Sequence, residues 1–443
     1  MTTYRKRNNN FLKRNNRYLT RDRVDFSSPF IIEITTTSNN QSITLPLIDL
    51  DGSQFNFRVN WGDGSAMESF TTHTGVSHVY ADIGVYNIEI WGTCEGWSVN
   101  NGAVRTRITD IINWGSGTKF SGFRYLAGGF YGCSNLKSFG PLNSEIKASR
   151  GGCKSFYRLF MGCTAANSAI HENLFAQHPL CTTFSETFRN ARVSVGSTIP
   201  ANLFINNTEV TTFLACFYGL SNISGSIPAT LFRNNIKVTN FGQLFYSCSN
   251  LTGAIPVNLF STNTEVTTFS QAFYGCVGLT EIPEQLFTNN TKVAFFSQTF
   301  YICSGITAIP ANLFKNNTLV TSFNQTFYLC QNIQGEIPQG FFANNLLVTS
   351  FNETFYTCDR LAFNKLVFVN SESDMITRFL NRNVNFTRAF FRQLNAETPT
   401  ATAPELWNCN FGTGTPTRTG CFSGSGNTVD TITNFNEIPA QWK

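Results

Sequence analysis

Residues 210–237 read VTTFLACFYGLSNISGSIPATLFRNNIK, residues 238–265 read VTNFGQLFYSCSNLTGAIPVNLFSTNTE, and residues 266–292 read VTTFSQAFYGCVGLTEIPEQLFTNNTK. The valine that opens each stretch recurs with spacings of 28, 28, 27, 27 and 28 residues, at Val210, Val238, Val266, Val293, Val320 and Val348. Self-similarity at a fixed period of this length is the signature of a repeat architecture. The period therefore decides the fold class of most of the chain.

Each repeat carries two phenylalanines four residues apart, a spacing that places both on one face of a helical turn. The pairs are Phe213 and Phe217, Phe241 and Phe245, Phe269 and Phe273, Phe296 and Phe300, Phe323 and Phe327, and Phe351 and Phe355. The LTEI or GITAI stretch that follows predicts a short strand, and the proline of IPxxLF opens a second short helical turn. No single repeat buries its Phe and Leu side chains alone, so we expect a solenoid with a parallel ladder of short strands.

A tyrosine follows the second phenylalanine of each repeat and forms a second column: Tyr218, Tyr246, Tyr274, Tyr301, Tyr328 and Tyr356. An exposed aromatic stripe suits sugar binding, so these residues are the candidate ligand face. The alternative is that the tyrosines pack against neighbouring repeats and expose only their hydroxyls. The Asn pairs of the repeat, such as Asn206 with Asn207 and Asn234 with Asn235, are expected to act as caps or stacked amide ladders.

The 13 cysteines follow the repeat rather than a disulfide framework. Seven of them recur at one position of successive units: Cys133, Cys163, Cys248, Cys276, Cys303, Cys330 and Cys358. Leu220 fills the same position in one repeat, which favours small, buried, reduced thiols over bridges. No CxxC pair is present, so a zinc site is not expected, and unpaired thiols favour assembly in a reducing cytoplasm.

Residues 29–104 predict a separate β domain, because IIEITTT, SITLPLI, FNFRVNW and VYNIEIW alternate apolar and polar residues between turns. The passages FNFRVNWGDGSA and VSHVYADIGVYNIEIWG resemble the PKD domain, an immunoglobulin-like β-sandwich. The matching residues are Trp61, Gly62, Asp63, Gly64, His78, Tyr80, Gly84 and Tyr86. The resemblance implies a spacer or interaction module. Asp49, Asp51 and Asp63 are weak candidates for calcium, and His78 is expected to be a hydrogen-bonded core residue.

Residues 105–443 resemble BspA-type leucine-rich repeats, whose units read V-T-x-(F/M)-x-x-x-F-x-x-C-x-x-L. Residues 105–363 are expected to form the solenoid, and residues 364–443 are expected to form degenerate repeats and a C-terminal cap. The predicted fold class is mainly β with short helical turns: an N-terminal Ig-like β-sandwich followed by a leucine-rich-repeat solenoid with 27–28-residue repeats. The resemblance implies a bacterial surface adhesin or a virion protein of a tailed phage.

Residues 1–28 are expected to form a basic, flexible N-terminal arm. Residues 1–23 hold eight Lys or Arg and one Asp, a net charge of +7, whereas the remainder holds 24 bases and 26 acids, a net charge of −2. Aromatic residues interleave with the charges, which favours docking into a groove of an acidic protein over nucleic-acid contact or a solubilising tail. The expected docking residues are Arg5, Lys6, Arg7, Phe11, Lys13, Arg14, Arg17 and Tyr18.

The composition argues against catalysis, cofactor binding and membrane insertion. The chain has only four histidines and 13% charged residues, and it lacks GxSxG, P-loop and HExxH motifs. No apolar run is long enough to span a bilayer, and no signal-peptide core precedes the β domain. We therefore expect a protein without enzymatic activity, cofactor or metal.

Three function classes remain. The first is a virion structural protein of a tailed phage, a head fibre or a capsid or tail decoration, assembled in the host cytoplasm and docked on capsid or other virion proteins through the arm. Its solenoid would meet a host-surface glycan or protein, and such fibres are commonly homo-oligomers. The second is a bacterial cell-surface adhesin, which requires an export signal. The third is an intracellular interaction scaffold.

Overall fold

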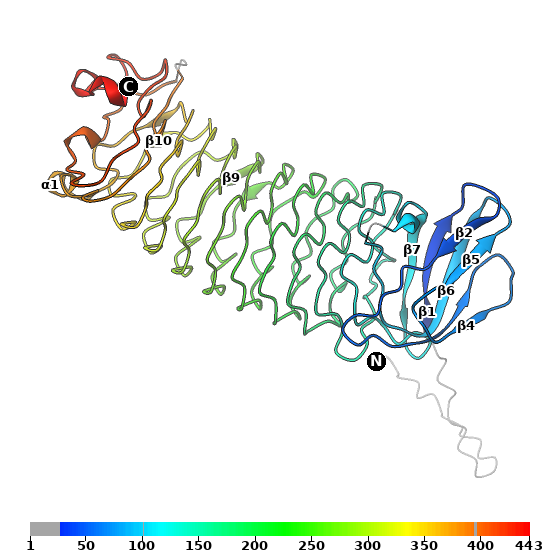
Figure 1. Cartoon of the computed structure of the whole chain (residues 1–443). Coiled ribbons are helices and arrows are strands. Elements are labelled where there is room, and N and C mark those ends of the chain that lie inside the picture. The colour runs from blue at the N-terminus through cyan, green and yellow to red at the C-terminus, as the bar shows by residue number, and fades with distance from the viewer. Residues whose placement is uncertain (1–26, 101, 394–396) are drawn as a thin grey trace, which may run out of the picture.

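The protein is described by a computed structural model over residues 27–100, 102–393 and 397–443. It is an elongated rod with a β domain at one end and the C-terminus at the other (Figure 1). Helix is scarce in the described residues: α1 (Glu372–Met375) is four residues long, and the 3-10 helices η1 to η4 are as short. The expectation of a mainly non-helical chain with an antiparallel N-terminal sheet is therefore confirmed.

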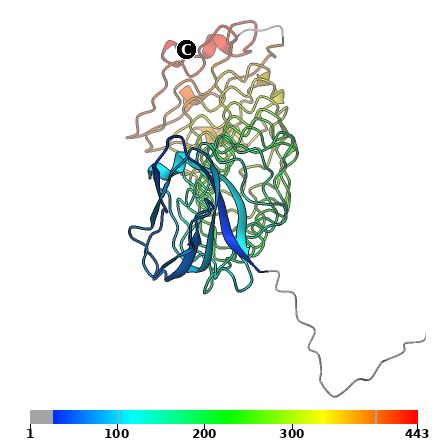
Figure 2. The same cartoon turned by 90° about the vertical axis from the view of Figure 1, so that its right-hand side faces the viewer.

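Five strands form the N-terminal sheet in the order β4-β3-β6-β1-β7, and every neighbouring pair is antiparallel. A separate antiparallel pair joins β2 to β5. Figure 2 shows these strands lying across the end of the rod. The bounds are β1 (Ser28–Thr35), β2 (Gln41–Thr44), β3 (Phe55–Asn60), β4 (Glu68–Phe70), β5 (Ser77–Tyr80), β6 (Val85–Cys94), η1 (Ala103–Thr106) and β7 (Ile108–Ser116).

Strand β7 belongs to the N-terminal sheet although it lies beyond residue 104, where the sequence-based domain boundary was placed. Its residues fall on the repeat side of that boundary, yet Trp114 pairs with Phe30 and Ile108 with Ile34 of β1. The entry segment of the first repeat is thus an edge strand of the sheet. Phe30 also packs on Trp97 and Phe123, which makes the hydrophobic core continuous from the sheet into the following coils.

The remaining coils, residues 120–443, are called the repeat stack. One residue of each coil bridges to its counterpart in the next coil in parallel, from Ser155 through Thr183 and Thr212 onward. The continuing positions are Asn240, Thr268, Phe295, Ser322, Ser350, Asn385 and Thr417. This ladder lies in the V-T-x-F segment, whereas strands were expected in the LTEI segment.

The LTEI segment pairs only in places. β8 (Gly253–Ala254) pairs with β9 (Leu279–Glu281), and β10 (Gly335–Glu336) pairs with β11 (Leu361–Ala362). Near the C-terminus the chain adds three 3-10 turns: η2 (Leu406–Asn408), η3 (Phe435–Glu437) and η4 (Ala440–Trp442). Trp442 in η4 is buried against Phe386, so the last turn covers the end of the core.

The paired phenylalanines do not lie on a helical turn, which corrects the sequence-based expectation. Ala215, between Phe213 and Phe217, has a φ of 53°, in the left-handed region. The backbone N–H groups of Phe213 and Phe217 donate to carbonyls of the next coil, of Asn240 and Leu244. Bonds between coils therefore replace the bonds within a helix, although both phenylalanines still point into the core.

Each of these segments holds two left-handed residues, four positions apart. Ala215 and Gly219 have φ values of 53° and 68°, and Gln271 and Gly275 have values of 59° and 69°. Glycine adopts this conformation without the steric cost that a Cβ brings. Glycine at the second of these positions, as at Gly219 and Gly275, therefore avoids the steric cost of the left-handed conformation.

Replacing Gly275 by Ala is expected to lower the free energy of unfolding by about 1 kcal/mol, the cost of a left-handed Cβ. Space does not limit this variant, since a Cβ would lie 3.4 Å from its nearest neighbour, Oγ of Ser247. Ser247 holds the same position one coil earlier, with a φ of 56°. Ser247→Gly should therefore cause no loss in chemical denaturation, and equal losses for the two variants would contradict the argument.

An ion pair between a buried carboxylate and a half-exposed guanidinium joins the N-terminal sheet to the repeat stack. Glu95, whose side chain is 2% exposed, accepts hydrogen bonds from the guanidinium of Arg150 and the hydroxyl of Ser149. The same guanidinium donates to the carbonyl of Gly52 at 2.8 Å. Burial alone would raise the pKa of Glu95, but the bonds from Arg150 and Ser149 hold it below its usual value. The two parts of the rod are therefore tied by charge as well as by apolar packing.

Candidate functional site

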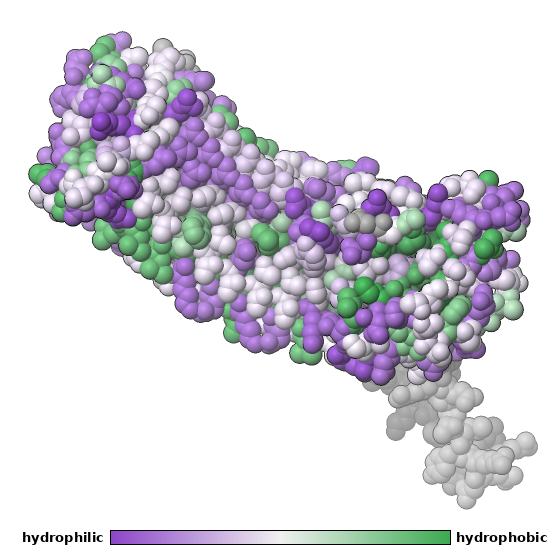
Figure 3. All heavy atoms as spheres, in the orientation of Figure 1, coloured by the Kyte–Doolittle hydropathy of each residue, from purple (hydrophilic) through white to green (hydrophobic). Residues whose placement is uncertain are grey.

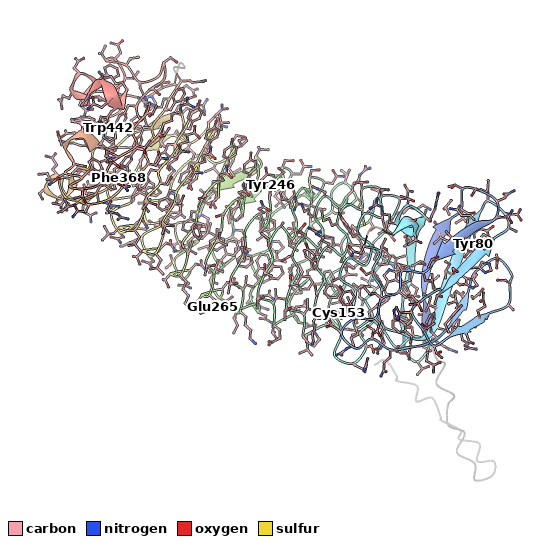
Figure 4. The ribbon with its side chains drawn as sticks, viewed as in Figure 1. Tyr80, Cys153, Tyr246, Glu265, Phe368 and Trp442 are labelled. Carbon is pink, nitrogen blue, oxygen red and sulfur yellow. The ribbon has the colours of Figure 1, made fainter. Side chains whose placement is uncertain are left out.

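The six tyrosines of the candidate ligand face stack on one another along the rod. Adjacent ring centroids lie 4.2 to 4.7 Å apart with planes within 8° of parallel. Each ring is half-buried. At one end the guanidinium of Arg189 lies 4.4 Å from the ring centroid of Tyr218, and at the other end Phe391 stacks on Tyr356 at 4.5 Å. Tyr246 and Glu265, labelled in Figure 4, mark opposite edges of the rod.

Stacking decides what the tyrosine column offers to a ligand. Because each ring covers the face of the next, ring edges and hydroxyls remain for contact. Burial raises the pKa of five of the phenols, Tyr218, Tyr246, Tyr274, Tyr301 and Tyr328, above the ordinary value. These hydroxyls therefore stay protonated and can both donate and accept hydrogen bonds. The ligand-face interpretation stays a prediction.

A column of glutamines, three residues before four of the six tyrosines, lies in the same segments. Nε2 of Gln243 donates to Oε1 of Gln271 at 2.6 Å, and the chain continues from Gln271 through Gln298 to Gln325. It ends on Oε2 of Glu353 at 2.6 Å. Sequence reasoning missed this column, although its signal, a Gln two residues before the second Phe, recurs in four successive repeats. The side of the repeat stack is therefore lined by hydrogen-bonded amides as well as phenols.

The cysteines are free thiols in the structure, which agrees with the expectation from their spacing. Six of them donate a hydrogen bond from Sγ to a phenylalanine carbonyl of the preceding coil, at sulfur-to-oxygen distances of 2.9 to 3.2 Å. Burial raises the pKa of Cys248 and Cys330 to about 12. These buried thiols are unsuited to nucleophilic chemistry.

The second asparagine of each pair forms a buried ladder, as its spacing suggested. In the central repeats its Nδ2 donates to a phenylalanine carbonyl at 3.1 to 3.2 Å and to the carbonyl of the preceding ladder residue at 2.8 to 3.0 Å. The members are Asn207, Asn235, Asn263, Asn290, Asn317 and Asn345, and Asn263 extends the set named from the sequence.

Different residues occupy the two ends of the asparagine ladder. His178 precedes Asn207, which donates to its carbonyl, and His178 accepts from the N–H of Cys153 at 2.9 Å through Nδ1. At the other end Nη2 of Arg378 donates to the carbonyl of Asn345 at 3.0 Å. Burial lowers the pKa of His178 to about 4, so its imidazole is neutral at neutral pH.

Stability is expected to fall as the pH drops from about 6.5 towards 4. In this window the unfolded chain protonates His178 and the folded chain does not, so the stabilisation is complete above 6.5 and is lost towards the folded pKa of about 4. The loss should reach about 3 kcal/mol. His178→Asn, which places the ladder's usual residue there, should lack this term. Parallel slopes for the two proteins in denaturation between pH 7.5 and 4.5 would contradict it.

The PKD-like turn forms a hydrogen-bonded cluster. His78 Nε2 lies 2.7 Å from Oδ2 of Asp63, and its ring stacks on Trp61 at 5.0 Å. Burial would raise the pKa of Asp63, but the bonds from Ser65 and His78 lower it to about 2. His78 is thus hydrogen-bonded, as expected, but it is half-buried and not a core residue, and both oxygens of Asp63 are engaged. No group of three or more potential metal-ligating side chains occurs among the residues the structure describes.

Residues 1–26 of the expected docking arm lie outside the described residues, and Ser28 is the first residue of β1. Residues 1–26 include all the expected docking residues: Arg5, Lys6, Arg7, Phe11, Lys13, Arg14, Arg17 and Tyr18. Within the described chain, no helix is long and apolar enough to cross a membrane. Neither a family model nor a curated protein matches the sequence.

Proposed function

We propose that this chain is a non-enzymatic structural protein of a tailed-phage virion, a head fibre or a capsid or tail decoration. The basic arm docks it on capsid or other virion proteins, and the repeat stack projects outward towards a host-surface glycan or protein. In fold terms we propose a PKD-type Ig-like sandwich followed by a BspA-type leucine-rich-repeat solenoid. The parallel bridges at the repeat period and the two antiparallel sheets support that assignment.

The observation that carries this proposal is that the basic N-terminal segment is joined to one end of the rod and the C-terminus lies at the other end. The described chain begins at Ser27, beside the N-terminal sheet, and the C-terminus lies at the opposite end (Figure 1). The +7 charge of residues 1–23 is therefore joined to one end of a body whose net charge is −2. A stiff rod with a charged segment at one end suits attachment at that end and display at the other.

Deletion of residues 1–23 is expected to abolish incorporation into particles while leaving the rest of the chain folded. The matched control replaces the eight Lys and Arg of this segment by Gln, which keeps its length and its aromatic residues. Purified particles are assayed by quantitative mass spectrometry, and folding is followed by circular dichroism. Full incorporation of the deletion variant would refute docking through the arm.

The second candidate is a bacterial cell-surface adhesin, which the resemblance of both the PKD-like domain and the repeats favours. Density-gradient fractionation of native source material, with intact-mass analysis of this chain, separates the two. Unprocessed protein in a particle band supports the virion role. A cleaved or lipidated form in the cell envelope supports the adhesin.

A further inference from the structure

A pocket of about 380 Å³ lies near the C-terminal end of the repeat stack, where α1 and the residues after it meet the coil that contains Asn345. Phe368 and Val369 supply apolar wall, and Arg378 and Arg382 line the same pocket. Specific small-molecule sites combine such walls with a few polar groups that fix orientation. The pocket has the size and the mixed lining of such a site.

The two arginines meet no carboxylate within ion-pair distance among the described residues. Arg378 is 8% exposed and donates only to carbonyls: Nε to Phe368 at 3.0 Å, and Nη2 to Phe342 at 3.1 Å and to Asn345. Its Nη1 is buried and has no acceptor in the described part of the chain. Two neighbouring guanidinium groups therefore keep a positive charge that the protein does not neutralise, which is costly in a partly buried site.

The charges around the pocket suit a small ligand that bears an anionic group. Asp374 also lines the pocket, but its Oδ2 accepts from the hydroxyl of Ser371 at 2.6 Å and pairs with neither arginine. Thr377 adds an exposed hydroxyl beside Arg378. Arginine binds carboxylate, sulfate and phosphate groups through paired N–H donors, which neutral ligands cannot match.

Apolar surface flanks the pocket, so the uncharged part of such a ligand can make apolar contacts. Leu346 lines the pocket and is 55% exposed. Leu347 on the same coil and Leu319 on the preceding coil are each about half exposed. Figure 3 shows apolar residues gathered along the edge of the rod beside α1. Elsewhere at this edge the repeats present ion pairs, such as Glu209 with Lys237, instead of leucines.

We propose that this pocket binds the carboxylate, sulfate or phosphate group of an acidic sugar, with Arg382 holding the oxyanion and the positive charge of Arg378 favouring it from the pocket wall. Asn370 and Thr377 lie at its wall to meet sugar hydroxyls, and Leu346 meets the apolar face of the ring. The origin of the sugar from a host-surface glycan rests on the proposed function. The affinity for the acidic sugar does not depend on the proposed function, because it is measured on the purified chain without particles.

Titration of the full-length protein with D-glucuronate, by calorimetry or ligand-observed NMR, tests the proposal. Arg382→Gln removes one charge without touching the asparagine ladder that Arg378 closes, and should weaken binding at least tenfold. Thr377→Asp should abolish binding, whereas Asp374→Asn should tighten it by removing a competing charge. Arg233→Gln, an exposed arginine in an earlier coil, is the control and should bind as the wild type does.

Three results would overturn the proposal. Equal affinity for D-glucose and D-glucuronate, or unchanged affinity in Arg382→Gln, would show that the guanidinium groups do not select an anion. Inorganic sulfate that binds as tightly as glucuronate would overturn the assignment to a sugar. Thermal unfolding of each variant, unchanged from the wild type, confirms that any loss of binding is local.

Discussion

Replacing Phe269 by Ala is expected to lower the free energy of unfolding by about 4 kcal/mol, within the range for a large aromatic removed from a packed core. Phe269 is fully buried in the middle of the repeat stack. Its ring stacks between Phe241, at 5.8 Å, and Phe296, at 6.0 Å. It also packs against Phe260 and Phe287, each at 4.7 Å between ring centroids. One truncation therefore opens a cavity that three successive coils share.

Chemical denaturation measures this loss, and hydrogen exchange should localise it to residues 241–300. Repeat proteins lose stability by repeat and by interface, so protection should fall in the coils beside the cavity and remain near the ends. Phe269→Leu keeps most of the volume and should cost less than about 1.5 kcal/mol. A loss of similar size for the leucine and alanine variants, or a uniform fall in protection, would contradict the shared-cavity argument.

Replacing Arg150 by Met is expected to lower the free energy of unfolding at neutral pH by clearly more than loss of an exposed ion pair does, because it leaves the carboxylate of Glu95, 2% exposed, without its counter-charge. The methionine keeps much of the apolar stem of the side chain. In the wild type Arg150 also ties the carbonyl of Gly52 to the repeat stack. The variant should therefore loosen the junction between the sheet and the coils specifically.

The penalty of Arg150→Met should shrink as the pH falls. Glu95 of the wild type has a pKa below that of an unfolded chain, about 4.5, so its stabilisation is complete above this value and is lost as the pH falls through the folded pKa. Without Arg150, burial raises that pKa, and protonation then relieves the buried charge. Denaturation of both proteins at pH 7 and pH 4 checks the sign. Lys137→Met, which removes an exposed partner of Glu33, is the control and should cost less than about 1 kcal/mol.

The repeat period and its apolar columns were predictable, because they depend only on which residues are apolar and how far apart they lie. Val210, Phe213 and Phe217 are fully buried, as the period required. The conformation between them was not predictable from spacing. A separation of four residues fits a helix, but the left-handed positions carry Ala215 and Gln243, whose side chains have no preference for that conformation. Bonds to the next coil determine it, and they depend on the assembled stack.

Contacts between distant parts of the chain explain the other differences. Strand β7 reads as the entry of a repeat, and only its pairing with β1, about 80 residues earlier, makes it part of the sheet. The ion pair of Glu95 with Arg150 joins residues 55 positions apart, and neither residue lies in a recognisable motif. The pocket at Arg378 arises where residues 369–383 lengthen one coil and interrupt the period. Where the period holds, the core residues could be predicted from the sequence. Where the period breaks, contacts between distant residues determine the structure.

The ladder of parallel bridges between successive coils makes the length of the molecule proportional to its number of repeats. Strand neighbours lie about 4.8 Å apart, so each duplication or loss of a 27–28-residue unit changes the reach of the rod by about that increment. The two ends are untouched by such an event, because each coil bonds only to the coils beside it. A change in the number of repeats can therefore set the distance between the N-terminal sheet and the C-terminal end in small steps, without a change in either end.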